Sequence, residues 1–462
     1  MVHDREPSAA AGGPRTRATE PEGARAGPRG TDAVDDSAPQ PGAVRRFRLT
    51  VVEGREPGRR WDSSSDGCSL GSHPSNDLVL DDPTASRFHC EIRMTPRGPR
   101  VRDLGSRNGT VLDGVTVADA FLRSGSLLRL GRVAVRFDVL PDSSRLPLSD
   151  RTRFGPLVGA SAAMRTCFAL LERAAASDAT VLIEGETGTG KTAAARAIHE
   201  ASARAGGPFV VVEGAGLPPG LLESELFGHE PGAFTDARAR RLGAFEEASG
   251  GTLFIDDVAE MPLPLQPKLL RALESREIRR LGRTAPIPVD VRVMAATNRD
   301  LRAEVNGGRF RPDLFYRLAV FRVTLPPLRE RPEDIPLVVA RLLEDLEAGP
   351  GGAALLDPAY LAALRGAAWP GNVRELRNHL ERCLALEDAL PPSEAADLAP
   401  GGPVDAGLPY AEARRRALDE FERRYLQALL EAHRRRVTPA AAAAGIDRVY
   451  LYRLLRRHGL KP

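Results

Sequence analysis

The chain has 462 residues, 42% of them hydrophobic and 27% charged, which is ordinary for a globular protein and is enough for about two to four domains. No apolar stretch approaches the roughly 18 residues that span a bilayer, and the first residues lack the apolar core of a secretory signal, so we expect a cytoplasmic protein. The four cysteines lie far apart without a CxxC pair, which argues against a disulfide framework or a zinc site, and a net charge of +3 indicates no partner by itself.

Two segments of different composition begin the chain. Residues 1–43 are rich in Ala, Gly, Pro, Arg and Asp and hold almost no large apolar side chain. Burial therefore cannot offset the entropy of ordering them, and a disordered tail is predicted. Residues 44–141 alternate short β-rich runs with turns of Gly, Asp, Asn or Pro, which predicts an all-β sandwich. The predicted strands are 47–52, 77–80, 89–92, 101–104, 126–130 and 133–140.

The rest of the chain has first mixed and then helical patterns. After a linker at 142–156, residues 157–390 alternate helical segments with the buried-strand runs TVLIEG, PFVVVEG, GTLFID and VRVMAATN. Apolar strands separated by helices are typical of an α/β domain with a parallel sheet. A second linker at 391–409 precedes a predicted all-α segment at 410–462.

The run GETGTGKT fits the phosphate-loop pattern GxxxxGK[ST] and lies between a predicted strand and a predicted helix. Its glycines let backbone N–H groups point at phosphates, at a helix N-terminus that favours anions. Lys191 is one of only three lysines among 65 basic residues, and its compact ammonium suits a narrow phosphate nest better than a guanidinium. The predicted nucleotide-binding residues are Gly185, Glu186, Thr187, Gly188, Thr189, Gly190, Lys191 and Thr192.

Two carboxylates follow the buried run GGTLFI. Asp256, at the strand end, is predicted to hold Mg²⁺ together with the Thr192 hydroxyl, and Asp257 to orient or deprotonate the attacking water. Alone, such a pair would be read as a solvated acidic turn. Beside a phosphate loop, the catalytic interpretation is favoured.

With these motifs in place, residues 157–390 resemble the AAA+ domain of bacterial enhancer-binding proteins, the ATPases that activate sigma-54 RNA polymerase. The resemblance implies a P-loop AAA+ fold with a helical lid, ATP and Mg²⁺ as cofactors, and a homo-oligomeric ring, which in this family is a hexamer. The matching segments, in order, are GETGTGKT, ELFGHEPGAFTDA (225–237), GGTLFIDD, AATNRDL (295–301), FRPDLFYRL (310–318), LPPLRERPEDI (325–335) and WPGNVREL (369–376).

The resemblance also implies roles for single residues. Asn298 is similar to the sensor that reads the γ-phosphate, and Arg374 to the second sensor arginine. Arg311 and Arg317 are similar to arginine fingers that reach a neighbouring subunit's nucleotide. A guanidinium supplied across an interface stabilises transition-state charge only after assembly, so hydrolysis is expected to depend on the ring.

The segment GAFTDA resembles the GAFTGA loop that contacts sigma-54 in this family. Phe234 and Thr235 are the implied contacts. Asp236 stands where the family has its second glycine, enters the left-handed region less freely and brings a negative charge, which predicts an altered grip on sigma-54. The whole predicted contact is Gly232, Ala233, Phe234, Thr235, Asp236 and Ala237.

Two further departures from the family concern hydrolysis. Asp257 stands where the family usually has the longer Glu, and Glu213 stands where it usually has an Asn. Two carboxylates facing each other would repel or share a proton, which raises one pKa. We therefore expect slow or differently regulated turnover.

Residues 44–141 resemble a forkhead-associated domain through LGSHPSNDLVL, SRFH and DLGSRNGT. Such domains bind phosphothreonine on loops at one end of a sandwich. Ser72 stands where an Arg is more usual, so either the affinity is lower or Arg87 supplies the charge. His89 is expected to be structural. The matching positions are Ser72, Ser86, Arg87, Ser106 and Asn108.

Residues 410–462 resemble the Fis-type helix-turn-helix of the same activators, with a turn at Gly445. From His433 to Pro462 the side-chain charge is 7 Arg + 1 Lys − 1 Asp = +7, an electrostatic footprint for DNA phosphates. The DNA candidates are Arg448, Tyr450, Arg453, Arg456 and Arg457, the expected core positions of this helix are Val449, Tyr452 and Leu455, and those of the preceding helix are Leu418, Phe421, Tyr425 and Leu429.

These expectations combine into one function. The predicted protein is an ATP-dependent transcriptional activator that binds upstream double-stranded DNA, remodels sigma-54 RNA polymerase holoenzyme as a ring, and senses a phosphothreonine protein. Two alternatives stay open: a DNA-binding regulator with altered or lost sigma-54 contact, which Asp236 suggests, and a phosphopeptide-binding scaffold with a vestigial ATPase, which Glu213 and Asp257 suggest.

Overall fold

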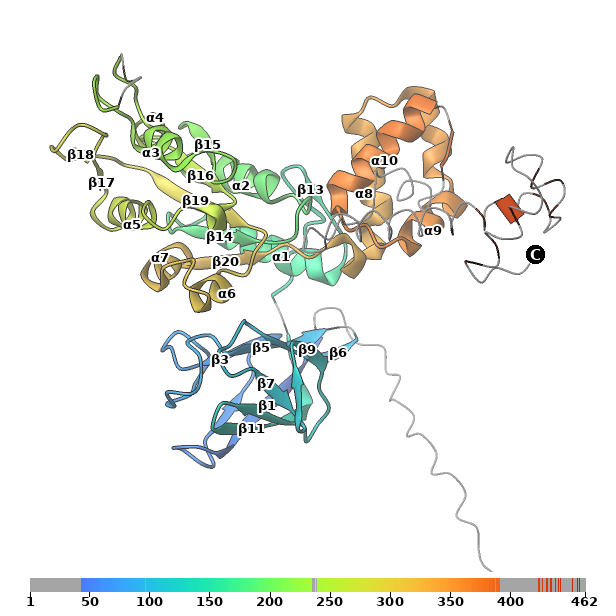
Figure 1. The fold of residues 1–462 in the computed structure, drawn as a ribbon. Coiled ribbons are helices and arrows are strands. Elements are labelled where there is room, and N and C mark those ends of the chain that lie inside the picture. The colour runs from blue at the N-terminus through green and yellow to red at the C-terminus, as the bar shows by residue number, and fades with distance from the viewer. Residues whose placement is uncertain are drawn as a thin grey trace, which may run out of the picture. The chain divides into compact units, whose positions relative to one another are not determined.

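A computed structural model describes residues 43–390 apart from 96, 146, 235, 236, 238 and 387, together with scattered positions between 423 and 457 (Figure 1). The predicted tail, the second linker and most of the predicted DNA-binding segment lie outside the described residues. So do Arg448, Tyr450, Arg453 and Arg456, and Thr235 and Asp236 of the predicted sigma-54 loop. Within the described part of the chain, no helix combines the length and the apolar character needed to span a bilayer.

The N-terminal domain is a β sandwich, as predicted. Its strands are β1 Ala43–Glu53, β2 Arg60–Asp62, β3 Gly67–Gly71, β4 Leu78–Val79, β5 Cys90–Thr95, β6 Gly98–Asp103, β7 Thr110–Leu112, β8 Val115–Val117, β9 Asp119–Phe121, β10 Leu127–Leu130 and β11 Val133–Arg145. One sheet has the order β2-β1-β11-β10-β7-β8 and the other β4-β3-β5-β6-β9. Alternate residues of β1, among them Phe47, Leu49 and Val51, are buried between the sheets.

The six strands predicted for this domain are present. The strands that the sequence pattern did not reveal are short: β2, β7, β8 and β9 have three residues each, and β3 has five with Gly at both ends. Runs of that length are too brief to display an alternation of apolar and polar side chains.

The central domain is built on a parallel sheet with helices on both sides (Figure 1). Its elements are α1 Ala162–Ala175, β14 Val181–Glu184, α2 Lys191–Glu200, β15 Phe209–Glu213, α3 Pro219–Phe227, α4 Ala244–Glu247, β16 Thr252–Asp256, α5 Gln266–Ser275, β19 Arg292–Thr297, α6 Leu301–Asn306, α7 Pro312–Leu318 and β20 Phe321–Thr324. Short pairs are β12 Arg153–Phe154 with β13 Leu157–Val158, and β17 Glu277–Ile278 with β18 Ile287–Pro288. Single 3-10 turns are η1 Val258–Glu260, η2 Leu328–Glu330 and η3 Pro332–Asp334.

The strand order β15-β16-β19-β14-β20 brings the predicted site together. All four neighbouring pairs are parallel, so the carboxyl ends of β14, β16 and β19 meet at one edge. The phosphate loop follows β14, the two aspartates end β16, and Asn298 follows β19. Ligands of open α/β sheets bind at this carboxyl edge.

A small helical domain follows the sheet. It contains η4 Gly349–Leu356 and the helices α8 Ile335–Asp345, α9 Pro358–Gly366 and α10 Asn372–Leu386, drawn in orange in Figure 1. Its core joins buried side chains from each helix, such as Val339, Leu364 and Leu380, with Trp369. The buried positions of α10 recur every three or four residues, which is the pattern of a helix with one apolar face.

The described positions of the C-terminal segment share a small apolar cluster. Its buried members are Leu426, Leu430, Val437, Ala441, Leu451 and Leu455. Leu455 is therefore a core residue, as expected, and Leu429 packs partly buried against the same cluster. Val449 and Tyr452 lie outside the described residues.

Candidate functional site

The phosphate loop joins β14 to α2 through glycines that no other residue could replace. Gly188 (φ +80°) and Gly190 (φ +103°) both have left-handed backbone conformations. A Cβ at Gly188 would lie 2.1 Å from the Gly371 carbonyl oxygen, which belongs to the segment just before α10. The loop is thus curled in the way that the motif predicts, and the lid approaches it closely.

Lys191 begins α2 and is folded onto the loop. Its Nζ donates to the carbonyl oxygens of Gly185 (3.0 Å) and Glu186 (3.2 Å). Burial lowers the pKa of Lys191, and the nearby Arg374 guanidinium lowers it further, whereas Asp257 and Asp256 act in the opposite direction. An anionic phosphate in the loop would offset the cost of burying this ammonium.

The predicted metal ligands face each other. The Thr192 hydroxyl donates to Asp256 Oδ2 over 2.9 Å, and the backbone N–H of Asp257 donates to Asp256 Oδ1 over 3.0 Å. Hydroxyl and carboxylate oxygens are the ligands that Mg²⁺ prefers, so these residues fit the ion that the motif implies.

Asp257 has the features of a reactive carboxylate. Its backbone is left-handed (φ +50°), and its Oδ1 atom is buried without a hydrogen-bond partner among the described residues. Burial raises its pKa, and the Asp256 charge raises it further. An unpartnered acceptor beside the metal ligands suits a water-orienting base.

The raised pKa of Asp257 has a different origin from the one expected. Glu213 pairs with Asp256 across the β15–β16 ladder, and its side chain is exposed. Burial is the largest cause of the raised Asp257 pKa, and the charges of Asp256 and Glu260 raise it further. The expectation that Glu213 faces Asp257 and perturbs it is therefore corrected: parallel register places Glu213 beside the metal ligand.

Both predicted sensors reach this edge of the sheet. Asn298 Nδ2 donates to the Thr187 hydroxyl over 3.3 Å. Arg374 lies in the first turn of α10, where the backbone N–H groups of Val373 (3.0 Å) and Arg374 (3.3 Å) share the Gly188 carbonyl oxygen. Strand, loop and lid thus bring the predicted nucleotide residues into one site.

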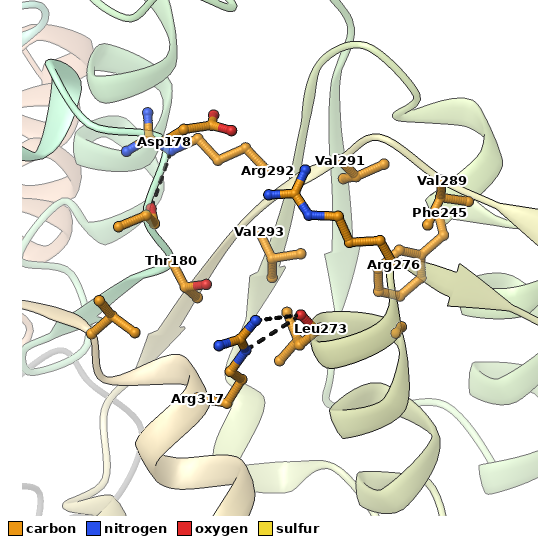
Figure 2. Close-up of a pocket in the computed structure, with 13 residues that line it drawn as sticks. Asp178, Thr180, Phe245, Leu273, Arg276, Val289, Val291, Arg292, Val293 and Arg317 are labelled. Atoms are coloured by element: carbon orange, nitrogen blue, oxygen red, sulfur yellow. Dashed lines mark hydrogen bonds between the residues drawn. The ribbon is translucent and has the colours of Figure 1, made fainter.

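The two predicted arginine fingers lie on α7 and have partners away from that site. Arg311 precedes the helix and forms a bidentate pair with Asp313 (3.0 and 2.6 Å). Arg317 donates to the Leu273 carbonyl oxygen over 2.9 and 3.3 Å, as Figure 2 shows. It lines a cavity of about 200 Å³ with Arg276 and Arg292.

That cavity lies at the opposite edge of the sheet from the phosphate loop. Arg292 is the first residue of β19, and Thr180, another lining residue, precedes β14. The phosphate loop begins where β14 ends. A guanidinium at this edge is therefore badly placed for the nucleotide of its own chain.

The two end residues of the predicted sigma-54 loop are bonded to each other. Gly232 (φ +80°) donates its N–H to the Ala237 carbonyl oxygen over 2.8 Å. Phe234 is 37% exposed and contacts the His229 ring edge-on at 5.0 Å. The predicted contact segment thus presents an exposed aromatic side chain.

The base of the same loop is fixed by a buried ion-pair cluster. The side chain of Arg280 is only 2% exposed and pairs with Glu246 of α4 and with Glu230 (2.7 Å), which directly precedes the loop. The two carboxylates raise the pKa of Arg280 and keep it charged. No sequence motif drew attention to this arginine.

In the sandwich, the loops that carry the predicted phosphopeptide residues are tied together. The N–H of Ser72 donates to the Ser86 carbonyl oxygen (2.9 Å), and the N–H of Arg107 donates to the Ser86 hydroxyl (2.9 Å). Asn108 Nδ2 donates to the Thr84 carbonyl oxygen (2.8 Å). Arg87 and Arg107 are both exposed, and each adjoins one of these groups in the chain.

Ser106 and His89 also make hydrogen bonds inside the sandwich. The Ser106 hydroxyl donates to Asp103 over 2.6 Å, so part of its hydrogen-bonding capacity is used inside the domain. His89 is fully buried, accepts from the Ser86 N–H at Nδ1 (3.1 Å) and lies 3.1 Å from the Gly109 carbonyl oxygen through Nε2. Burial lowers its pKa. It joins two loops, as expected.

One residue at the nucleotide site escaped the sequence reasoning. Asn372 is fully buried at the start of α10, and its side chain bonds to both the phosphate loop and the segment that leads into the lid. The only signal in the sequence was its place in WPGNVREL. There it follows Pro370 and Gly371, which disfavour a helix, and precedes the predicted sensor Arg374 by two residues.

Comparison with known proteins supports the assignments for the first two domains. Residues 157–324 match the Sigma-54 interaction domain, 68–131 the FHA domain and 329–399 the AAA+ ATPase lid domain. Regulatory protein AtoC of Escherichia coli K12 is 42% identical over 323 residues, which are 68% of this chain and 70% of AtoC. Transcriptional regulatory protein GlrR of the same strain is 38% identical over 389 residues, which are 83% of this chain and 86% of GlrR.

Among solved structures, NtrX from Brucella abortus in complex with ATP is 39% identical. The match covers 67% of this chain and 71% of that chain, with a TM-score of 0.48.

Proposed function

Because the chain belongs to the family of sigma-54-dependent AAA+ transcription activators, we propose that it hydrolyses ATP as a ring in which each nucleotide site is completed by the next subunit. The protein is an ATPase with an FHA domain, the module for phosphothreonine recognition. The observation that carries the proposal is the position of Arg317 at the edge of the sheet opposite its own phosphate loop.

The residues of one chain supply most of the site. In this proposal the loop N–H groups and Lys191 hold the phosphates, and Thr192 and Asp256 hold Mg²⁺. Bound Mg²⁺ supplies neutralisation of the charge that develops on the phosphates. Asp257 orients the water and accepts its proton, for which its raised pKa suits it. Asn298 and Arg374 read the terminal phosphate.

The remaining positive charge at each nucleotide site comes from the adjacent subunit of the ring. Arg311 and Arg317 stand at the two ends of α7, so one rigid helix presents both. Assembly exchanges their present partners, Asp313 and the Leu273 carbonyl oxygen, for phosphate oxygens. For Arg317, a charge-assisted bond to phosphate is stronger than its present bond to a neutral carbonyl, which favours the exchange.

The test of the ring is complementation between inactive subunits. Lys191→Ala and Arg317→Ala are each expected to abolish ATP turnover. Mixed in equal amounts, they form some sites with an intact phosphate loop and an intact finger from the neighbour, so turnover should return to a fraction of the wild-type rate. Wild-type activity per subunit should also rise with protein concentration. If the mixture stays inactive although both variants assemble, the arginine does not act between subunits.

The sigma-54 contact is proposed to lie at Phe234, whose side chain is exposed. Binding to sigma-54 with the nucleotide site trapped by a transition-state analogue tests it. Phe234→Ala should lose binding and keep ATP turnover. Asp236→Gly should bind more tightly than the wild type, since it removes a negative charge and gives the backbone the conformational freedom of glycine. Unchanged binding by Phe234→Ala would favour the regulator that has lost sigma-54 contact.

The sandwich is proposed to recognise a phosphorylated protein, and the C-terminal segment to bind a specific DNA site. A phosphothreonine peptide binds at Ser72, Ser86, Arg87 and the neighbouring Ser106 and Asn108, with Arg87 as the phosphate-binding cation, because Ser72 cannot be one. The C-terminal segment binds upstream DNA through its basic side chains, of which Arg457 is described and exposed. We expect the protein to bind a phosphothreonine peptide and not to bind the unphosphorylated peptide. Arg87→Ala should abolish this binding.

A further inference from the structure

The lid helix α10 begins with a residue that joins three parts of the ATPase. The side chain of Asn372 is fully buried. Its Oδ1 accepts from the N–H of Leu328, in the segment that leads from the sheet into the lid (2.8 Å). Its Nδ2 donates to the Thr187 carbonyl oxygen (3.1 Å) and to the Glu186 carboxylate (3.2 Å), both in the phosphate loop.

Contacts around Asn372 hold the same two surfaces together. The Gly188 carbonyl oxygen accepts from the first N–H groups of α10. Arg329 Nη1 donates to the Glu186 carboxylate over 2.6 Å. Gly188 leaves no room for a Cβ against Gly371. The lid cannot turn away from the phosphate loop without breaking these bonds.

Asparagine is the residue type that this position requires. Its backbone is left-handed (φ +53°), which Asn tolerates better than most residues. Its amide both donates and accepts, which the carbonyl and carboxylate on one side and the N–H on the other demand. Aspartate would place a third oxygen against two acceptors, and glycine would keep the backbone but lose every side-chain bond.

The consequence concerns Arg374, two residues further along the same turn. Its backbone N–H donates to the Gly188 carbonyl oxygen (3.3 Å), and a Cβ built at Gly188 would lie 3.0 Å from the Arg374 Cβ, so the Arg374 side chain starts directly against the phosphate loop. We propose that Asn372 is a positioning residue for ATP hydrolysis: it latches the lid to the phosphate loop and thereby fixes Arg374 where the terminal phosphate binds. This inference rests on the proposed role of Arg374.

The experiment compares two substitutions at Asn372 with the same two at Asn378, an exposed residue of the same helix. Full-length Asn372→Gly, Asn372→Asp, Asn378→Gly and Asn378→Asp are assayed for kcat and KM with ATP, at protein concentrations where activity per subunit is constant. Affinity for ADP, which lacks the terminal phosphate, and the melting temperature are measured in parallel.

The latch predicts a split between chemistry and binding. Asn372→Gly loses a charge-assisted bond and two neutral bonds, and Asn372→Asp replaces the bonds to Glu186 and Thr187 with repulsion between oxygens. The kcat of both variants should therefore fall about 10-fold or more. ADP affinity should change by less than about threefold, since the loop N–H groups and Lys191 remain. The Asn378 pair should match the wild type. An unchanged kcat at Asn372, or an ADP affinity that falls as far as kcat, overturns the proposal.

A double substitution shows whether the latch acts through the arginine. If it does, the double variant Asn372→Gly with Arg374→Ala should have the same kcat as Arg374→Ala alone, within about twofold. The reason is that Arg374→Ala removes the guanidinium that Asn372→Gly would only misplace. Losses that multiply would show that Asn372 acts by another route. A fully active Arg374→Ala would instead refute the role assigned to Arg374, and the latch with it, so the two failures can be told apart.

Discussion

Asp257 has properties that suit its proposed role in catalysis and that cost stability. Its position after β16 was evident from the sequence, but its left-handed backbone, its unpartnered oxygen and its raised pKa were not. Those properties arise because the chain bends sharply at the end of a buried strand, beside another carboxylate. A polar group left without a partner in the fold is more often explained by function than by stability.

We predict that Asp257→Asn slows ATP turnover by about 10² to 10⁴-fold, the usual contribution of a general base. The same change should raise the melting temperature near pH 8. A raised pKa means that the fold favours the protonated carboxyl, so its charged form costs free energy above that pKa, and the amide avoids this cost.

The pH dependence gives the check on this prediction. The gain in melting temperature should shrink as the pH falls toward about 4, the ordinary Asp value, because the wild-type carboxyl is then also neutral. Asp388→Asn, at an exposed position, is the control and should change neither property. A gain that persists unchanged at low pH would contradict the electrostatic explanation.

At the scale of elements, loops are positioned by contacts that lie outside their own motifs. The predicted sigma-54 loop depends on Arg280, which lies more than 40 residues further along the chain and pairs with carboxylates on both sides of the loop base. Gly71 has a similar importance in the sandwich: a Cβ there would lie 2.2 Å from the Arg87 carbonyl oxygen. Arg280 therefore positions its loop by charge, and Gly71 positions its loop because it has no side chain.

We predict that Arg280→Met weakens sigma-54 binding at least about 10-fold while ATP turnover stays within a few-fold of the wild type. Removing one partner of a buried ion pair costs about 3–5 kcal/mol, and here it leaves two carboxylates repelling each other at the loop base. Binding to sigma-54 in the trapped state measures the effect. Arg283→Met, whose side chain is 42% exposed and 3.7 Å from Glu230, should bind normally.

Gly71→Ala is predicted to weaken phosphothreonine-peptide binding by at least about 10-fold, because the methyl group separates β3 from the loop that carries Ser86 and Arg87. Gly67→Ala on the same strand meets its nearest atom at 3.5 Å, an ordinary contact, and should bind the peptide normally. Equal affinities of the two variants, measured by fluorescence anisotropy, would contradict the steric argument.

At the scale of the whole molecule, each described part has its own apolar core. The sandwich has a cluster of buried side chains around Phe47, the sheet domain has two, around Phe254 and Phe245, the lid has one around Trp369, and the C-terminal positions have one around Leu451. Parts with their own cores can fold and function separately. Hydrolysis and DNA binding should therefore be separable by truncation.

We predict that a chain ending at residue 390 retains ATP turnover and loses DNA binding. The lid cluster is complete by Leu390, whereas the +7 charge between His433 and Pro462 is removed. In the full chain, Arg457→Ala should weaken DNA binding and reduce the slope of log affinity against log salt by about one, if it contacts a phosphate. DNA binding by the shortened chain at full affinity would place the DNA site elsewhere.

The sequence by itself determined the order of the sandwich and the ATPase domain, the phosphate loop, the acidic strand end and the four apolar strands of the central sheet. These features are encoded locally, by periodicity, glycines and contiguous motifs. The fifth strand, β20, mixes exposed and buried residues over four positions and gave no such signal.

Only the tertiary structure decided which groups face one another. Parallel register set Glu213 beside Asp256 and left Asp257 to be perturbed by burial. Packing of the lid brought Asn372 onto a loop 185 residues away, and strand order put Arg317 at the edge opposite its own nucleotide site. Contacts between residues so distant in sequence depend on how the elements pack, because a local pattern carries no information about which surface will meet it.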